Sequence, residues 1–375
     1  MPLPPASAIG YCANVHPVRD LGGLKSALRE NAAPLAAEFG RPFPVGLWLP
    51  RSALAELDAA GRSRFAVWLA AAGLRTTTFN AFPFGDFHAA SVKRQVYQPD
   101  WTAPERRRYT TDAAELLAEC LPEGGEGSVS TLPLGYRLDF PRTSRAAAVA
   151  QLRLLAGDLA ELRSRTGKTI RAALEPEPGC VLDRTEDALA LFAELTDPAE
   201  REHLGICFDV CHAAVMGEAP AAAIAALHAA GIRIPKVQLS AAVEVPAPRD
   251  PVARRYLAQF AEPRYLHQVA AGRLFLDDLT PEFALDPPAE WLAAGPWRVH
   301  FHVPVHHAVL GPLRTTAGHL PFALAALHAL PYAMDVEVET YTWGVLPEPD
   351  QDLASGLADE VREVRRLAAI AGAAR

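Results

Sequence analysis

Short apolar runs alternate with amphipathic stretches along the chain. The runs AIGYCANV, PVGLWLP and LRTTTFNAF predict strands. After the first run, Asp20 is a candidate N-cap for a helix with leucines at helical spacing. After the second, Ser52 is expected to open a helix that carries Leu54 and Leu69 on one face and ends at Gly73. The order strand, helix, strand favours an α/β fold.

The same alternation continues to the end of the chain. Further strands are predicted in SVSTLPLGY, TIRAALEPEPG, HLGICFDVC, IPKVQLS, RVHFHVPVHH and MDVEVETYTW. Eight barrel strands, with one or two extra strands in the insertions, account for these nine runs and favour a (β/α)8 TIM barrel over an open doubly wound sheet. Neither a Gly-x-Gly-x-x-Gly nor a P-loop sequence supports the open sheet. We expect one domain over 1–375, with irregular insertions at about 86–127 and 244–296 over the C-terminal face of the barrel.

Composition narrows the class of protein. The 375 residues are half hydrophobic, which is enough for one large core. The net charge is −8 and no basic run stands out, so we expect no nucleic-acid partner. Five scattered cysteines are typical of a reducing compartment. The start MPLPPASAIG does not resemble a signal peptide and charged residues or proline interrupt the alanine-rich stretches, so we expect a cytoplasmic protein without membrane insertion.

Polar side chains alternate with apolar ones in the later strands. Alternate residues of a strand share a face, and the outer face of a barrel packs on helices, so these polar groups should point into the lumen. A salt bridge would explain any one of the carboxylates, but burying the whole set unpaired would be very unfavourable. The set therefore predicts a divalent cation at the C-terminal rim. Its members are Glu175 and Glu177, Asp209 beside Cys207 and Cys211, Gln238 and Ser240, His300 and His302, and Glu337 and Glu339.

The segment GICFDVCHAAVMGE resembles the Asp-x-x-His segment of the xylose isomerase-like superfamily, which includes endonuclease IV, and the LEP sequence upstream is similar to its glutamate strand. The resemblance implies a divalent metal, Mn, Zn, Co or Mg, and makes His212 a ligand or a substrate contact. Gln238 is a departure, because relatives carry histidine there, so we expect the site to bind metal loosely. The implied metal ligands are Glu175, Asp209, Gln238, His302 and Glu339.

A narrower resemblance covers most of the chain. The motifs GYCANVHP, STLPLGY, KVQLSAA, YLHQV, HFHVPV and VEVETYTW together are similar to the EboE family, TIM-barrel proteins of the ebo metabolite-traffic operon. That resemblance implies a role in making or moving a small-molecule precursor, with other ebo operon proteins as partners. It does not supply a reaction.

Further polar and aromatic residues are candidate contacts to a small polyhydroxylated metabolite. Any one of them could instead be a satisfied packing residue. His267 falls in the second insertion, where a lid over the substrate is expected. The candidate substrate contacts are Asn14, His16, Asn80, Glu177, His267, His300, Arg314, Glu337, Tyr341 and Trp343.

Three functions are compatible with these features. The leading hypothesis is an isomerase, epimerase or lyase in which Glu175 and Glu339 are candidate bases and His212 assists. The second is an endonuclease IV-like phosphodiesterase, which the acidic chain and Gln238 disfavour. The third is a metabolite-binding protein without turnover.

Overall fold

Eight parallel strands form a barrel in the computed structural model, which describes residues 8–347 and 351–373. The sheet has nine strand segments in the order β3-β2-β1-β15-β8-β7-β6-β5-β4. Only Thr76 and Thr77 separate β3 from β4, so these two segments make one interrupted strand. The segments are β1 (Gly10–Cys12), β2 (Phe43–Gly46), β3 (Leu74–Arg75), β4 (Thr78–Asn80), β5 (Glu126–Thr131), β6 (Thr169–Leu174), β7 (Leu204–Asp209), β8 (Lys236–Leu239) and β15 (Asp335–Val338).

The barrel closes between the second strand and the interrupted third strand. Leu47, just after β2, forms a parallel bridge with Phe79 of β4. Its backbone N–H donates to the Thr78 carbonyl at 3.0 Å, and the Asn80 N–H donates to the Leu47 carbonyl at 2.7 Å. The expected TIM-barrel fold is therefore confirmed.

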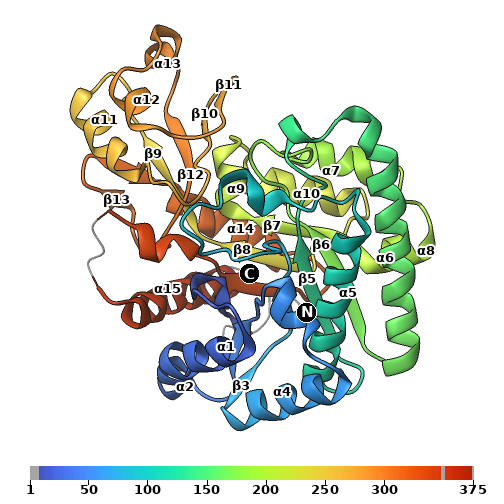
Figure 1. The fold of residues 1–375 in the computed structure, drawn as a ribbon. Helices are drawn as coiled ribbons and strands as arrows, with labels where there is room; N and C mark the ends of the chain where they lie inside the picture. Colours follow the sequence, from blue (N-terminus) through green and yellow to red (C-terminus); the bar gives the residue numbers. More distant parts are fainter. Residues whose placement is uncertain (1–7, 348–350, 374–375) are drawn as a thin grey trace.

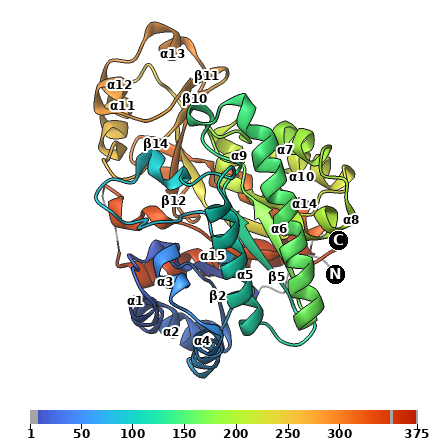
Figure 2. The same ribbon diagram turned by 45° about the vertical axis from the view of Figure 1, so that its right-hand side comes forward.

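Helices cover the outside of the barrel (Figures 1 and 2). Neighbouring helices pack on one another, for example α5 on α4 and α6. Asp20 caps the first helix, as the sequence predicts, by accepting from the Gly23 N–H, and α6 ends at Gly167, whose φ of 69° is left-handed. The helices are α1 (Leu21–Ala27) and α2 (Ala33–Phe39) joined by the π-helical η3 (Leu28–Ala32), α3 (Arg51–Ala55), α4 (Ala59–Ala71), α5 (Pro104–Cys120), α6 (Arg145–Thr166), α7 (Thr185–Phe192), α8 (Pro198–His203), α9 (Val210–Val215), α10 (Pro220–Ala229), α14 (Leu320–His328) and α15 (Leu353–Ala373).

A second, antiparallel sheet stands beside the barrel mouth and forms the yellow-to-orange lobe of Figure 1. Its strand order is β11-β10-β12-β9-β14-β13, and it has a hydrophobic core of its own around Trp297 and Phe301. Its elements are β9 (Ala241–Val245), α11 (Pro251–Leu257), β10 (Val269–Ala271), β11 (Leu274–Leu276), α12 (Pro281–Leu285), α13 (Ala289–Ala293), β12 (Trp297–Val303), β13 (Val309–Leu310) and β14 (Leu313–Thr315).

Three local expectations from the sequence are wrong. RVHFHV forms β12, which pairs antiparallel with β9 and β10 and is not a barrel strand. The stretch 244–296 is not irregular, because it supplies much of the second sheet and its helices. Ser52 does not open a long helix, because it lies inside the short α3, which begins at Arg51, and Asp58 caps a separate helix α4 through the Gly61 N–H.

Two segments cross the mouth of the barrel and touch each other. One is 82–103, which includes the 3-10 helix η4 (Lys93–Tyr97), and the other is 262–268 between α11 and β10. The N–H groups of Val92 and Lys93 both donate to the Arg264 carbonyl, at 2.8 and 2.9 Å. Between Gly85 and Gly127, residues 104–120 form the outer helix α5, so only the first part of that stretch lies over the mouth.

No helix in 8–347 or 351–373 is both long and apolar enough to cross a membrane.

Candidate metal centre

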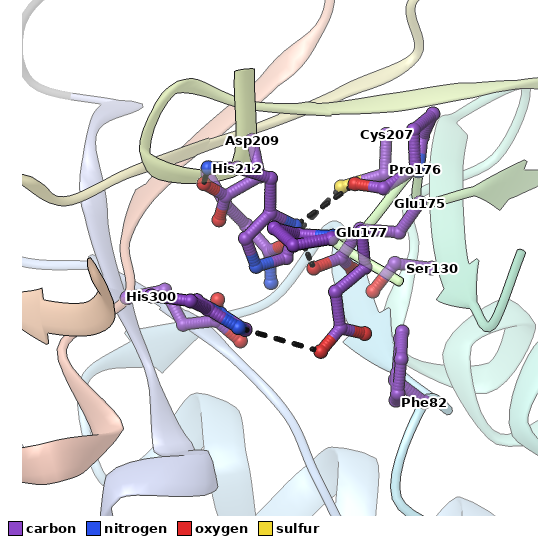
Figure 3. A network of polar contacts seen from close by, with 12 residues as sticks. Phe82, Ser130, Glu175, Pro176, Glu177, Cys207, Asp209, His212 and His300 are labelled. Carbon is purple, nitrogen blue, oxygen red and sulfur yellow. Dashed lines mark hydrogen bonds and ion pairs between the residues drawn. The ribbon is translucent and has the colours of Figure 1, made fainter. Parts of the chain in front are cut away.

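Three histidine rings meet at the mouth of the barrel. His212 lies in the first turn of α9, directly after β7, and His300 and His302 are alternate residues of β12, so both face the barrel. The Nε2 atom of His302 is 3.2 Å from Nε2 of His212 and 3.1 Å from Nε2 of His300. All three side chains are buried. Figure 3 shows His212 and His300 turned toward the carboxylates of this site.

Hydrogen bonds fix which ring nitrogen of His212 and His302 carries the proton. Nδ1 of His212 is 2.9 Å from the Pro176 carbonyl, and Nδ1 of His302 is 2.8 Å from the Glu339 carbonyl. A carbonyl oxygen only accepts, so both Nδ1 atoms are donors. In a neutral imidazole the other nitrogen, Nε2, then has a free lone pair.

The same reasoning holds for His300. Its Nδ1 is 2.6 Å from Oε1 of Gln268. The Gln268 amide cannot be turned round, because its Nε2 donates to the Pro178 carbonyl at 2.9 Å. His300 therefore also donates from Nδ1 and presents the lone pair of Nε2.

Three Nε2 lone pairs thus face one another in a buried space. A shared proton would relieve the repulsion, but burial lowers the pKa of His212 to about 3 and that of His302 to about 4, and it holds the pKa of His300 well below its usual value. A cation bound by the lone pairs resolves the conflict. Histidine ligands of metals characteristically donate their other N–H to carbonyl or carboxylate groups, as these three do to carbonyl and amide oxygens.

Two carboxylates with unpaired oxygens adjoin the histidines. Asp209 ends β7 and accepts from the His212 N–H at 2.9 Å through Oδ1, while its Oδ2 has no partner among the described residues. Oε2 of Glu175 also has none. Burial raises the pKa of both, and for Glu175 the Glu339 and Asp209 carboxylates add to the effect. Candidate ligand atoms of Glu175, Asp209 and His212 lie within 4.8 Å of one another, as do those of Asp209, Cys211 and His302.

Glu339 is held by amides rather than by a cationic side chain. Its Oε1 accepts from Asn14 at 2.6 Å and from Asn80 at 2.9 Å. Its Oε2 is 3.8 Å from Nδ1 of His302. Burial, together with the Asp209 carboxylate, raises the pKa of Glu339 well above its usual value.

Glu177 extends the acidic group toward the segment that crosses the mouth. Its Oε1 accepts from the Tyr97 hydroxyl at 2.8 Å, and Nδ1 of His300 is 3.8 Å away. Burial raises the pKa of Glu177 to about 8, although the Tyr97 hydrogen bond opposes the rise. In Figure 3 its carboxylate lies between His300 and Phe82.

Gln238 is completely buried on β8. Its Oε1 accepts from the Cys207 thiol at 3.2 Å, and its Nε2 has no partner among the described residues. Exchange of the amide oxygen and nitrogen is isosteric. The exchanged amide would donate to the Cys207 sulfur and leave its oxygen without a partner among the described residues, so the predicted ligand role of Gln238 remains a prediction.

A buried ion pair lies among the lumen residues of the same strands, although Oε2 of Glu337 has no hydrogen-bond partner among the described residues. Nζ of Lys236, two residues before Gln238, is 2.7 Å from Oε1 of Glu337 and donates to Ser130 at 3.0 Å. Lys236 is fully buried and Glu337 is 2% exposed. A Cβ at Gly46 would lie 1.7 Å from Oε2 of Glu337, so β2 needs glycine here.

A pocket opens above these groups. The empty space between its walls, including the open mouth, is about 470 Å³. The predicted site residues that line it are Asn14, Asn80, Glu175, Glu177, His212, His300, Glu339 and Tyr341.

Other predicted residues do not line this pocket. His16 bonds Tyr11, Trp343 donates to Glu360, and Arg314 is exposed on β14. Glu337 is bound to Lys236. His267 supports the backbone of His300, since its Nδ1 is 2.9 Å from that carbonyl, and its Nε2 is 2.9 Å from Glu262.

Several contributors to the site were not predicted, or were predicted in another place. Cys211 was expected beside Asp209 on a strand, but it lies on α9, and its sulfur still joins the cluster with Asp209 and His302. Gln268 is adjacent to the noted His267, and Lys236 stands in the quoted motif KVQLS, but nothing in the sequence showed their partners. Tyr97, which bonds Glu177, lies in a stretch that carried no periodic signal.

Comparison with known proteins supports this architecture. A family model described as "Xylose isomerase-like TIM barrel" matches residues 38–260, more than half of the chain. No curated protein matches the chain.

Solved structures of similar fold share little sequence with it. A xylose isomerase-like TIM barrel protein from Mycobacterium smegmatis in complex with magnesium is 13% identical, with 98% of this chain and 99% of that chain covered and a TM-score of 0.53. D-Psicose 3-epimerase with D-tagatose from Clostridium cellulolyticum H10 is 11% identical, with 99% of each chain covered and a TM-score of 0.50. A xylose isomerase domain protein from Planctomyces limnophilus is 15% identical, with 88% and 90% covered and a TM-score of 0.49. At these identities the likeness to the first two structures concerns the fold alone.

Proposed function

This chain belongs to the xylose isomerase-like TIM barrel family, and from that premise we propose that it is a metal-dependent isomerase, epimerase or lyase acting on a small polyhydroxylated molecule. The observation that carries the proposal is the convergence of three histidine Nε2 atoms beside Asp209 and Glu175, whose outer oxygens have no partner among the described residues. The magnesium of one relative and the sugar of another agree with it.

The donor set indicates the kind of ion. Imidazole nitrogens with carboxylate oxygens suit Mn, Zn or Co better than Mg, which prefers oxygen ligands alone. We propose His212, His300, His302, Asp209 and Glu175 as the residues that would hold it, with Glu339 and Gln238 at the edge of the set. When bound, such an ion would polarise a carbonyl or hydroxyl oxygen of the ligand.

The surrounding side chains are suited to proton transfer. Glu175 and Glu339 both line the pocket, and burial raises the pKa of both, which makes each a better proton acceptor once it is ionised. Asn14 and Asn80 fix the direction of the Glu339 carboxylate. Glu177 has one oxygen bound to Tyr97 and the other without a partner among the described residues, so it is placed to accept from a ligand hydroxyl.

Hydrogen exchange tests the reaction. The Mn-loaded protein in deuterium oxide is expected to wash deuterium into one C–H position of a substrate drawn from a panel of ketoses, aldoses and inositols, as followed by proton NMR. Glu175→Gln should abolish the exchange, whereas Glu30→Gln, an exposed carboxylate on η3, should leave it unchanged. Ligand binding without exchange would favour a metabolite-binding protein without turnover.

Phosphodiester hydrolysis has less support. Lys93 is the one lysine or arginine among the residues described as lining the pocket, and its Nζ is already bound to Asp278 at 2.7 Å and to the Glu262 carbonyl at 3.0 Å. We therefore expect no incision of abasic-site DNA at low salt. The sequence resemblance to the EboE family supports a place in making or moving a precursor, with ebo operon proteins as proposed partners.

A further inference from the structure

The pocket has two chemically different halves. Its floor consists of Asn14, Asn80, three glutamates and two histidines, all polar. We call its outer part the apolar wall, and it comes from the two segments that cross the mouth and from Tyr341 after β15. The members of the apolar wall are Phe82, Pro83, Phe87, Val92, Val96, Tyr97, Tyr265, Leu266 and Tyr341. Lys93 also lines the pocket, but its ammonium is bound to Asp278 and to the Glu262 carbonyl.

Two tyrosine hydroxyls of the apolar wall are already used within the protein. The Tyr97 hydroxyl donates to Glu177 and accepts from Gln268. The Tyr265 hydroxyl is 3.1 Å from Nδ1 of His88, whose Nε2 is 2.7 Å from a backbone carbonyl. His88 Nε2 is therefore the donor and its Nδ1 accepts from Tyr265. These two residues present ring surface rather than a free hydrogen-bonding group to the pocket.

Aromatic rings dominate one side of the apolar wall. The ring centroids of Phe87, Tyr265 and Tyr341 are 5.0 to 5.1 Å from one another. Phe82 meets Tyr97 edge-on with centroids 6.0 Å apart. Such clusters accept a further ring in edge or offset contact.

Unpaired polar atoms gather on the floor. Among the described residues that line the pocket, the buried side-chain atoms without a partner are Oδ1 of Asn14, Oε2 of Glu175 and Oε2 of Glu177. All three belong to the floor. A free polyol has hydroxyls on every side, and those against the apolar wall would lose water without gaining a partner, which is unfavourable.

We infer that the ligand is amphipathic, with its oxygen-bearing part on the polar floor and an aromatic ring against the apolar wall. This inference rests on the proposed function for the oxygen-bearing part. The ring is placed by the apolar wall alone. An unsubstituted sugar or inositol leaves that half of the pocket unmatched.

Three compounds that contain a vicinal diol test the inference, namely glycerol, 1-cyclohexyl-1,2-ethanediol and 1-phenyl-1,2-ethanediol. Their affinities are measured by calorimetric titration of the Mn-loaded protein. The phenyl compound is expected to bind about tenfold or more tightly than glycerol, from burial of its ring. It should bind about threefold more tightly than the cyclohexyl compound, from ring contacts. Equal affinity of the phenyl compound and glycerol, or no binding of the phenyl compound, would overturn the inference, and equal affinity of the two cyclic compounds would overturn the aromatic assignment.

A matched pair of variants locates the ring. Val96→Asn places an amide in the partly exposed rim of the apolar wall and should reduce the preference for the phenyl compound at least about threefold. Val67 lies on the outer face of α4 and is 70% exposed, so Val67→Asn should leave the preference for the phenyl compound unchanged. An unchanged preference in Val96→Asn overturns the placement of the ring.

Titration of metal-stripped protein separates this inference from the proposed function. If the phenyl preference persists there and added metal changes nothing, the amphipathic ligand stands and the metal-dependent function fails. If metal strengthens binding of all three compounds equally and no phenyl preference exists, the metal-dependent function stands and the amphipathic ligand fails.

Discussion

Two groups of buried polar side chains share the barrel lumen, and they differ in whether the protein compensates its own charges. Lys236 and Glu337 form an ion pair 2.7 Å long, with Ser130 as a further partner of the lysine. At the mouth, His212, His300 and His302 turn three lone pairs toward one another beside carboxylate oxygens that have no partner among the described residues. Burial of charge alone therefore does not indicate a site, and neither does an oxygen without a hydrogen bond, because Oε2 of Glu337 also has no partner among the described residues. The two groups differ in that Glu337 has a cationic side chain beside it and the carboxylates at the mouth have none among the residues that the structure describes.

Breaking the compensated pair should have the largest effect. Lys236→Met leaves Glu337 buried without its cation and should lower the free energy of unfolding by about 3–5 kcal/mol, measured by urea denaturation. Lys93→Met removes a half-exposed pair with Asp278 and should cost less than about 1 kcal/mol. Equal losses of the free energy of unfolding in the two variants would mean that the buried ion pair stabilises the protein no more than the Lys93–Asp278 pair does.

Removing one histidine should affect metal binding more than folding. His302→Leu removes the ring that both other histidines approach, so we expect metal affinity to fall by more than about 100-fold, the upper range seen when only a supporting residue is lost. The free energy of unfolding of the metal-free protein should fall less than in Lys236→Met, since the lone-pair repulsion is relieved. His228→Leu, at an exposed position on α10, is the control. Unchanged affinity would place the ion elsewhere.

Gln268 holds the tautomer of His300 without touching the proposed ion. Gln268→Leu should lower metal affinity by about 10- to 100-fold, and Gln268→Asn should recover little because its amide is one methylene shorter. Calorimetric titration of metal-stripped protein measures both. An affinity equal to that of the parent would show that His300 does not depend on this hydrogen bond.

A third case of a buried charge is a carboxylate that has hydrogen bonds but no cationic partner among the described residues. Glu360 on α15 accepts from Thr340, from Trp343 and from the Val305 N–H, yet burial raises its pKa to about 7. A raised pKa means that the folded state holds a proton that the unfolded state releases, so its stabilising effect is complete below about pH 4.5 and is lost as the pH rises to 7.

Glu360→Gln removes that dependence. The free energy of unfolding of the parent relative to this variant should fall by about 2 kcal/mol between pH 5 and pH 7, as measured by urea denaturation at several pH values. If the difference in the free energy of unfolding stays constant with pH, or grows in favour of the parent as the pH rises, the pKa of Glu360 is not raised.

The sequence predicts the barrel well because its signal is repeated. Strands and helices alternate at regular intervals, and side chains at the carboxyl ends of parallel strands must meet, so the order of the strands alone brings Glu175, Asp209 and Glu339 together. The same logic fails for β12. Alternation shows that His300 and His302 share a face, but it does not show which sheet their strand joins, and the antiparallel pairing with β9 is a tertiary contact.

The sequence could not predict which side chains of the site pair with one another. Lys236 neutralises Glu337 across neighbouring strands, and Gln268 orients His300 from the segment that ends just before β10. Neither pairing leaves a local pattern. The two segments over the mouth were expected to be irregular, so the apolar wall that they build was not foreseen.

Metal content is the most direct test of the contrast between compensated and uncompensated groups. The protein, stripped of metal and then dialysed against Mn or Zn, is analysed for elements beside Asp209→Asn and Glu360→Gln, two variants that each neutralise one buried carboxylate. The account predicts about one divalent ion per chain in the parent and in Glu360→Gln, and a marked loss in Asp209→Asn. A parent that holds no ion, or an Asp209→Asn protein that holds as much as the parent, would contradict it.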